Sequence, residues 1–251
     1  MAKVAIGIDV GGTGIKGALV DVKKGALVGE RLRVETPQGG RPNDIAEVVK
    51  DLIQVLDPEG TATAIGICFP AVVQHGVTKS AANVSKEWIG LDADELFTRL
   101  IGKPVHLIND ADAAGVAEMR FGVGKKLKGL VMMTTLGTGI GTALFIDGRL
   151  VPNTELGHIE IQGKDYETQA AFSAKERENL SWQDWATRLQ TYYTKLEDLF
   201  TPDLFVVGGG VSKEHEDFLP LLNLRTEIVP AKLKNTAGII GAAMVAFKSS
   251  K

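Results

Sequence analysis

Cysteine is nearly absent from this chain of 251 residues, which contains Cys68 alone. A single cysteine excludes a disulfide within the chain and a cysteine-rich zinc site. Because Cys68 lies in the apolar run Ala64-Ile-Gly-Ile-Cys-Phe69, we expect its thiol to be a small, buried part of the core.

A strong excess of charge and long apolar runs are missing as well. The formal net charge is −3, which argues against a protein whose whole surface binds nucleic acid or membrane. No apolar run approaches the roughly 20 residues of a transmembrane helix. Met1-Ala-Lys3 leads directly into a β-branched run, without the pattern of a signal peptide. We therefore expect a cytoplasmic protein with no nucleic-acid partner and no membrane partner.

No linker rich in proline or serine divides the chain, and 44% of its residues are hydrophobic. That content suffices for one large domain or two small ones. Both halves begin with a strand, a glycine turn and a second strand, which suggests a duplicated core. The expected strands are Lys3–Asp9, Ile15–Asp21, Leu27–Glu35, Thr63–Phe69, Val105–Ile108, Leu130–Thr135, Gly141–Ile146 and Leu204–Val207. The expected helices are Pro42–Leu56, Asp92–Leu100, Ala111–Phe121, Ser181–Leu199 and Thr236–Phe247, with Asp92 and Ser181 as N-caps.

Three glycine clusters each follow an apolar, β-branched run. They are Asp9-Val-Gly-Gly-Thr-Gly-Ile-Lys16, Leu136-Gly-Thr-Gly-Ile-Gly141 and Val206-Val-Gly-Gly-Gly-Val211. Glycine has no Cβ, so backbone N–H groups in such turns can approach phosphate oxygens closely. One such hairpin would favour a role in the turn alone, but three in one chain indicate a phosphoryl-transfer enzyme.

The first glycine turn carries groups that suit a phosphate chain and its metal. Its amides and the Thr13 hydroxyl can bind phosphate oxygens, and Lys16 adds a positive charge. Asp9 can reach Mg²⁺ directly or through water.

Asn109 and Asp110 follow the strand Val105–Ile108 and open a helix. A carboxylate in this place is either an N-cap or a functional group in a cleft, and the residues leave both interpretations open. A kinase that phosphorylates a hydroxyl needs a carboxylate to accept its proton. Asp112 is a weaker candidate for this base, because it should point away from Asp110 on the helix.

Glu155 and His158 lie close together in Thr154-Glu-Leu-Gly-His-Ile-Glu160. A carboxylate and an imidazole can bond adjacent hydroxyls of a sugar. A metal site is the rival interpretation. It is disfavoured because no cysteine lies nearby and the chain has few histidines, four in all.

Several of these motifs resemble the ROK family of sugar kinases and repressors. The motifs are Asp9–Lys16, Leu107–Ala114, Leu136–Gly141 and Glu155–His158. The narrower resemblance is to the branch of that family that phosphorylates glucose from inorganic polyphosphate. It rests on Ala81–Gly90, Val151–Glu160, Pro202–Ser212 and Val229–Gly238.

The resemblance implies an α/β protein with a duplicated actin-like, ribonuclease-H-like fold and two lobes with the sugar in the interlobe cleft. The implied small lobe comprises residues 1–108 and 236–251, and the large lobe residues 109–235. Asp110 resembles the catalytic base, and the implied glucose contacts are Asn83, Asn109, Asp110, Glu155, His158 and Glu167. The implied donor-phosphate residues are Gly11, Gly12, Thr13, Lys16, Gly137, Thr138, Gly139, Gly208, Gly209 and Gly210, the last three holding adenosine when the donor is ATP.

The activity implied is transfer of the terminal phosphoryl group of polyphosphate to the 6-hydroxyl of glucose, with Mg²⁺ near Asp9 as cofactor and a homodimer as the assembly. The alternative is a hexokinase that uses ATP, or both donors, and acts on glucose, mannose or an N-acylated hexosamine. Many ROK kinases carry a cysteine-rich zinc motif after the Gly-His pair, whereas Gly157-His158 is followed by no cysteine, so we expect no zinc site. A sugar-sensing repressor is the third possibility, and the eight residues before Asp9 leave no room there for a DNA-binding module.

Overall fold

The structure is a computed structural model that describes residues 3–250, and its chain divides into two compact units. The first unit comprises the chain up to Ala117 together with the segment from Thr236 onward, and the second comprises Glu118–Asn235. The division falls inside α3 (Asp110–Phe121), whereas the sequence predicts a boundary at the end of the preceding strand.

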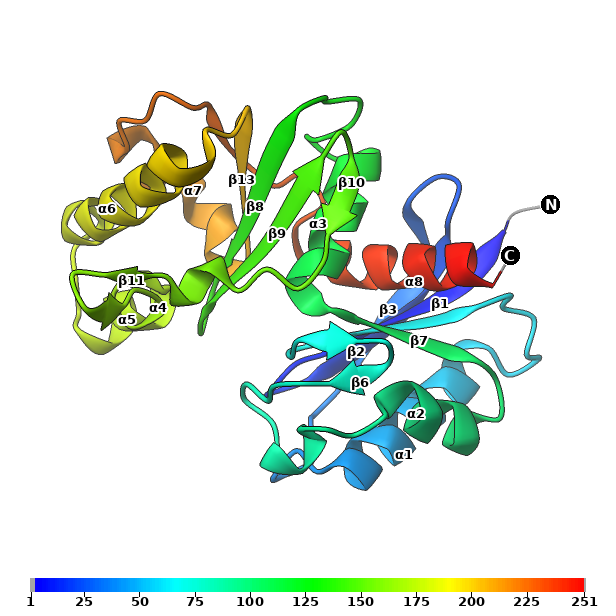
Figure 1. Cartoon of the computed structure of the whole chain (residues 1–251). Helices are drawn as coiled ribbons and strands as arrows, with labels where there is room; N and C mark the ends of the chain where they lie inside the picture. The colour runs from blue at the N-terminus through cyan, green and yellow to red at the C-terminus, as the bar shows by residue number, and fades with distance from the viewer. Residues whose placement is uncertain (1–2, 251) are drawn as a thin grey trace. The chain divides into compact units, whose positions relative to one another are not determined.

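The first unit is built on a five-stranded sheet with the order β3-β2-β1-β4-β7 (Figure 1). Its strands are β1 (Val4–Val10), β2 (Ile15–Asp21), β3 (Ala26–Val34), β4 (Ile65–Phe69) and β7 (Val105–Asn109). The first three strands form an antiparallel meander, and β4 and β7 continue the sheet from β1 in parallel. The carboxyl ends of β1, β4 and β7 therefore meet at one edge of the sheet.

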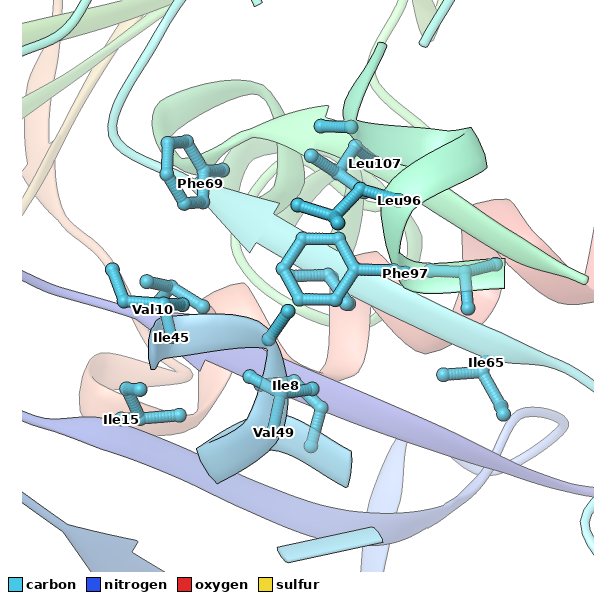
Figure 2. Packing of buried hydrophobic residues seen from close by; sticks show 14 of the residues in the cluster. Ile8, Val10, Ile15, Ile45, Val49, Ile65, Phe69, Leu96, Phe97 and Leu107 are labelled. Atoms are coloured by element: carbon cyan, nitrogen blue, oxygen red, sulfur yellow. The ribbon is translucent and has the colours of Figure 1, made fainter. Parts of the chain in front are cut away.

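Helices α1 (Pro42–Leu56) and α2 (Ala93–Ile101) pack on one face of this sheet. The apolar core between them and the strands contains Ile8, Val10, Ile45, Val49 and Phe97 (Figure 2). Alternation along a strand sends successive side chains to opposite faces, so Ile6 and Ile8 enter this core while Gly7 faces the other way.

Helix α8 (Ala237–Ser249) covers the other face and lies directly on the backbone of β1 and β4. A Cβ built at Gly66 would lie 2.0 Å from the carbonyl oxygen of Ala242, and one at Gly7 would lie 2.0 Å from that of Ile239. The glycines in these strands thus permit the close approach of the helix, because any side chain there would meet backbone atoms.

We predict that Gly66→Ala lowers the free energy of unfolding by about 3 kcal/mol, at the upper end of the cost of overpacking a core. The reason is that the new methyl group would collide with backbone rather than with a flexible side chain. Urea denaturation followed by circular dichroism measures the change. An unfolding midpoint equal to that of the unchanged protein would show that α8 does not pack this closely.

The second unit repeats the topology of the first, with a five-stranded sheet in the order β10-β9-β8-β13-β14. Its strands are β8 (Leu130–Leu136), β9 (Ile140–Ile146), β10 (Arg149–Val151), β13 (Leu204–Gly208) and β14 (Ile228–Pro230). Again the first three are antiparallel and the last two continue from β8 in parallel. The predicted duplicated α/β fold is therefore confirmed within the two units.

The long helix α6 (Trp182–Phe200) supplies much of the second core, where Trp185, Leu189, Tyr192 and Tyr193 are fully buried. The remaining elements are short. They are β5 (Val73–Gln74), β6 (Val77–Thr78), η1 (Lys86–Trp88), η2 (Leu156–His158), β11 (Glu160–Ile161), β12 (Lys164–Asp165), α4 (Glu167–Ala170), α5 (Phe172–Arg177), η3 (Gly210–Glu214), α7 (His215–Phe218), η4 (Leu219–Leu221) and η5 (Lys234–Thr236).

Within residues 3–250, no helix has the length and the apolar content that crossing a membrane requires.

Candidate active site

The carboxyl ends of β1, β4 and β7 bring Asp9, Cys68 and Asp110 together in the first unit. Asp9 pairs with Cys68 in the strand register, and Phe69 pairs with Asn109, directly before Asp110. The Cys68 thiol donates to Asp9 Oδ1 at 3.6 Å. Burial raises the pKa of this thiol well above its ordinary value, and the negative charges of Asp9 and Asp110 raise it further. Cys68 is fully buried, as the sequence predicted.

The sequence left open whether the Asn109-Asp110 pair caps a helix or supplies a functional group, and in the structure the two residues differ in their hydrogen bonds. Asn109 Oδ1 accepts from the amides of Ala111 and Asp112 at 2.9 and 3.0 Å, so Asn109 caps α3. Its Nδ2 donates to the carbonyl oxygen of Ala71 at 3.1 Å. Asp110, in the first turn, is half-buried and accepts from the Ala111 amide at 2.8 Å, while Asp112 is buried. The side chain of Asn109 therefore caps the helix, and the carboxylate of Asp110 is the group of this pair that suits a functional role.

The first glycine turn is closed on itself and is held by Arg33 of β3 and by Thr36, which follows that strand. Gly11 N donates to Gly14 O at 3.1 Å, and the Thr36 hydroxyl donates to Gly11 O at 2.5 Å. The Arg33 guanidinium donates to Thr13 O at 3.2 Å and occupies the space where a side chain on Gly14 would lie. The turn is therefore fixed by bonds from residues outside it to its carbonyl oxygens, while Thr13 stays exposed.

Lys16 and Asn83 border the same turn. The Lys16 ammonium lies 3.1 Å from Asp9 Oδ2, and both side chains are partly buried. Asn83, whose φ of 58° lies in the left-handed region, packs against Gly12, where a Cβ would come within 2.9 Å of the Asn83 Cβ. Asn83, Gly12 and Thr13 are all exposed. The first unit thus gathers a carboxylate, an ammonium, a hydroxyl and a side-chain amide around one exposed loop.

Asp9 fits a metal ion that is held mainly by phosphates. Its carboxylate is 23% exposed, and the first turn of α8 lies next to it, since a Cβ on Gly238 would be 3.9 Å from Asp9 Cγ. Mg²⁺ in kinases is bound through one or two carboxylates, several waters and the substrate phosphates. Among residues 3–250, no cluster of three or more His, Cys, Asp or Glu side chains could hold a metal.

The second glycine turn belongs to the second unit and joins β8 to β9. Gly137 N donates to Gly139 O at 3.0 Å, which closes the turn. From α5, the Ser173 hydroxyl donates to Thr138 O at 2.6 Å, and the Ser173 amide donates to Gly137 O at 3.1 Å. Thr138 is exposed at the tip. This turn, like the first, is held by bonds to its carbonyl groups, which leaves its outer side accessible.

The third glycine cluster lies against the end of β8, directly before the second turn. Gly209 has a φ of 84°, and a Cβ on it would lie 2.2 Å from Leu136 O. Only glycine suits this position, since both the backbone conformation and the contact exclude a side chain. The structure therefore brings Gly208–Gly210 and Gly137–Gly139 together in one unit.

Glu155, His158 and Glu167 form a cluster in the second unit. His158 Nε2 lies 4.0 Å from Glu155 Oε2 and 3.9 Å from Glu167 Oε1. Burial raises the pKa of Glu155; the charge of His158 acts against that shift, and the charge of Glu167 adds to it. Glu167 Oε2 accepts from the Ile140 amide at 2.7 Å and lies where a side chain on Gly139 would be. Two carboxylates and an imidazole thus adjoin the second glycine turn, an arrangement that suits several neighbouring hydroxyl groups.

Four residues that hold these groups in place were not found from the sequence: Arg33, Thr36, Asp165 and Ser173. Arg33, Thr36 and Ser173 act through contacts with segments 20 to 35 positions away, whereas the partners of Asp165 lie seven and two positions from it. Only the basic character of Arg33 is a signal in the sequence. The structure places the predicted residues of each unit near one another, and their individual roles stay predictions.

The model of the ROK family matches residues 5–176, and the chain belongs to this family. It is 47% identical over 239 residues to a polyphosphate glucokinase of Mycobacterium tuberculosis, covering 95% of this chain and 89% of that relative.

Among solved structures, it resembles the inorganic polyphosphate/ATP-glucomannokinase of Arthrobacter sp. strain KM with a TM-score of 0.94 and 53% identity, covering 98% of this chain and 99% of that one. A ROK glucokinase of Streptomyces griseus, solved with glucose and AMPPNP, has a TM-score of 0.85 at 24% identity over 98% of this chain and 99% of its own, a likeness of fold. The predicted actin-like class is confirmed by these neighbours.

Proposed function

We propose that this protein transfers the terminal phosphoryl group of inorganic polyphosphate to the 6-hydroxyl of glucose, giving glucose 6-phosphate. The observation that carries the proposal is the 47% identity to a polyphosphate glucokinase over 95% of the chain. The geometry of the two units supports it independently. Each unit has an exposed glycine turn of the kind that binds phosphate, with carboxylates nearby.

On the acceptor side, we propose Asp110 as the general base. Its place in the first turn of α3, next to the Asn109 cap, holds the carboxylate at the strand edge where it can accept the proton of the attacking hydroxyl. The other hydroxyl groups of glucose would be bound by Asn83, Glu155, His158 and Glu167, and by Asn109 through the second hydrogen of its Nδ2, since its other bonds cap α3 and reach Ala71. These polar groups fix the orientation of the sugar, which selects the hydroxyl that reacts.

On the donor side, we propose that the amides of the glycine turns and the hydroxyls of Thr13 and Thr138 bind phosphate oxygens. The Lys16 ammonium stabilises charge on the transferred group, since phosphoryl transfer depends on positioning and electrostatics. A divalent cation, which we propose to be Mg²⁺ near Asp9, would when bound neutralise negative charge on the donor phosphates.

ATP is a second candidate donor. A specific observation favours it, because the Arthrobacter relative at 53% identity is a polyphosphate/ATP-glucomannokinase. Gly208–Gly210 would then hold the adenosine. The same relative makes mannose a candidate acceptor beside glucose. Polyphosphate and ATP present the same terminal phosphoryl group, so the residues proposed for the reacting atoms serve both donors.

The acceptor atom is tested by comparing glucose with 6-deoxyglucose, using polyphosphate and Mg²⁺ and following phosphorylated sugar by ³¹P NMR. We expect glucose 6-phosphate from glucose. From 6-deoxyglucose we expect no phosphorylated product but competitive inhibition, because only the reacting hydroxyl is missing. Phosphorylation of 6-deoxyglucose at a comparable rate would show that another hydroxyl is the acceptor.

We also propose that the protein is a homodimer, on the strength of the family resemblance. Sedimentation equilibrium of the purified chain, of mass 26.8 kDa, tests it. A mass near that of two chains is expected, and a mass of one chain at all concentrations would contradict the proposal.

A further inference from the structure

Asp165 contacts two of the three residues in the cluster of Glu155, His158 and Glu167 in the second unit. It ends β12, which pairs with β11 in a short antiparallel hairpin that places Glu160 opposite Asp165. One carboxylate oxygen, Oδ2, lies 2.9 Å from His158 Nδ1. The other, Oδ1, accepts from the backbone amide of Glu167 at 3.1 Å. One side chain therefore fastens both His158 and the start of α4.

The bond to Asp165 determines how His158 carries its proton. An ionised carboxylate only accepts hydrogen bonds, so His158 Nδ1 must be the protonated nitrogen of the neutral ring. Nε2 is then the nitrogen turned toward Glu155 and Glu167, at 4.0 and 3.9 Å. The hydrogen bond that His158 donates to Asp165 raises the pKa of His158, partial burial opposes this shift, and the charges of Glu167, Asp165 and Glu155 raise the pKa further.

The second bond of Asp165 fixes the position of Glu167. The Glu167 amide is tied to Asp165 Oδ1, and the Thr168 hydroxyl donates to the Asp165 carbonyl oxygen at 2.7 Å. The Glu167 carboxylate extends from this point to the Ile140 amide beside the second glycine turn. Asp165 thus connects the imidazole of His158 to the backbone of the residue that carries one carboxylate of the same cluster.

We propose that Asp165 is a positioning residue for the sugar: it fixes His158 with Nδ1 protonated and Nε2 presented to a sugar hydroxyl, and it anchors Glu167 beside that nitrogen. This inference rests on the proposed function, because the hydroxyl is that of the glucose acceptor. In metal sites, partners that orient a histidine through its second nitrogen typically change affinity or activity about 10- to 100-fold when they are removed, and we expect an effect of that order here.

The test is Asp165→Asn, which keeps the shape of the side chain and removes its charge. We expect KM for glucose to rise about 10-fold or more, with little change in KM for polyphosphate. In protein labelled with ¹⁵N-histidine, the NMR shifts of the His158 ring should show a loss of the Nδ1-protonated tautomer and a lower pKa. The pH dependence of KM for glucose should move to lower pH with it. Glu160→Gln is the matched control, since it removes the opposite carboxylate of the same hairpin. It should change neither KM for glucose nor the tautomer and pKa of His158.

A double-mutant cycle with His158→Gln separates positioning from general loss of structure. If Asp165 acts through His158, the effect of Asp165→Asn on KM for glucose should be smaller when His158 is already replaced. The inference would be overturned if Asp165→Asn raised KM for glucose by the same factor with and without His158→Gln. It would also be overturned if Asp165→Asn left both the tautomer of His158 and KM for glucose unchanged. Failure of the unchanged protein to phosphorylate glucose from any donor would instead overturn the proposed function.

Discussion

Replacement of Asp110 by asparagine is expected to lower kcat by about 10²- to 10⁴-fold, the usual contribution of a general base. Asparagine has nearly the same shape but cannot accept a proton from the attacking hydroxyl. The Asn109 side chain still caps α3 in the variant, since its bonds to Ala111 and Asp112 do not involve residue 110. Helix α3 should therefore remain folded, and glucose binding measured by isothermal titration calorimetry should persist.

The control for Asp110→Asn is Asp44→Asn. Asp44 is also a carboxylate in the first turn of a helix, α1, and it is exposed. Both variants lose a favourable charge at a helix N-terminus, which is worth about 0.3–1 kcal/mol of stability. Only Asp110→Asn should lose turnover. A kcat within a fewfold of the unchanged protein for Asp110→Asn would exclude Asp110 as the base.

Removal of the Lys16 charge by Lys16→Met is expected to lower kcat by about 10²-fold, comparable to the loss of one group that stabilises transition-state charge. The ammonium lies 3.1 Å from Asp9 and beside the first glycine turn, where it can neutralise charge on the transferred phosphoryl group. Because polyphosphate and ATP share that group, kcat should fall by a similar factor with every donor that the protein accepts. Steady-state kinetics with each donor measures this.

Lys24→Met is the matched control for Lys16→Met. Lys24 is an exposed lysine in the turn between β2 and β3, on the same meander as Lys16. Its removal should leave kcat unchanged. An equal loss in both variants would point to a general effect of net charge, and a loss for Lys16→Met with only one donor would place Lys16 on the donor tail instead of the reacting group.

The elements with strong periodicity were predictable from the sequence. The bounds of α1 and β2 match the predictions, and Asp92 and Ser181 cap their helices through the amides of Glu95 and Asp184. The glycine turns were predictable because glycine clusters after β-branched runs have few other uses. The repeated sheet order follows from the same pattern of strand, turn and strand.

The short elements around the proposed sugar-binding cluster could not be predicted. Strands β11 and β12 have two residues each, and α4 has four, too few to show any period. Ser173 gains its importance from the carbonyl group of Thr138, 35 positions earlier, and Asp165 from a short hairpin that brings it to His158, seven positions earlier. Thr36 likewise bonds Gly11, 25 positions earlier in the chain, and no local pattern announces such a contact.

The measurement that tests the central claim most directly is formation of glucose 6-phosphate with Mg²⁺ and a single donor, either long-chain polyphosphate free of nucleotide or ATP. The proposal predicts turnover with polyphosphate alone, and a kcat/KM for that donor that ATP does not exceed. Turnover with ATP and none with polyphosphate would contradict it, and would make the chain an ATP-dependent sugar kinase.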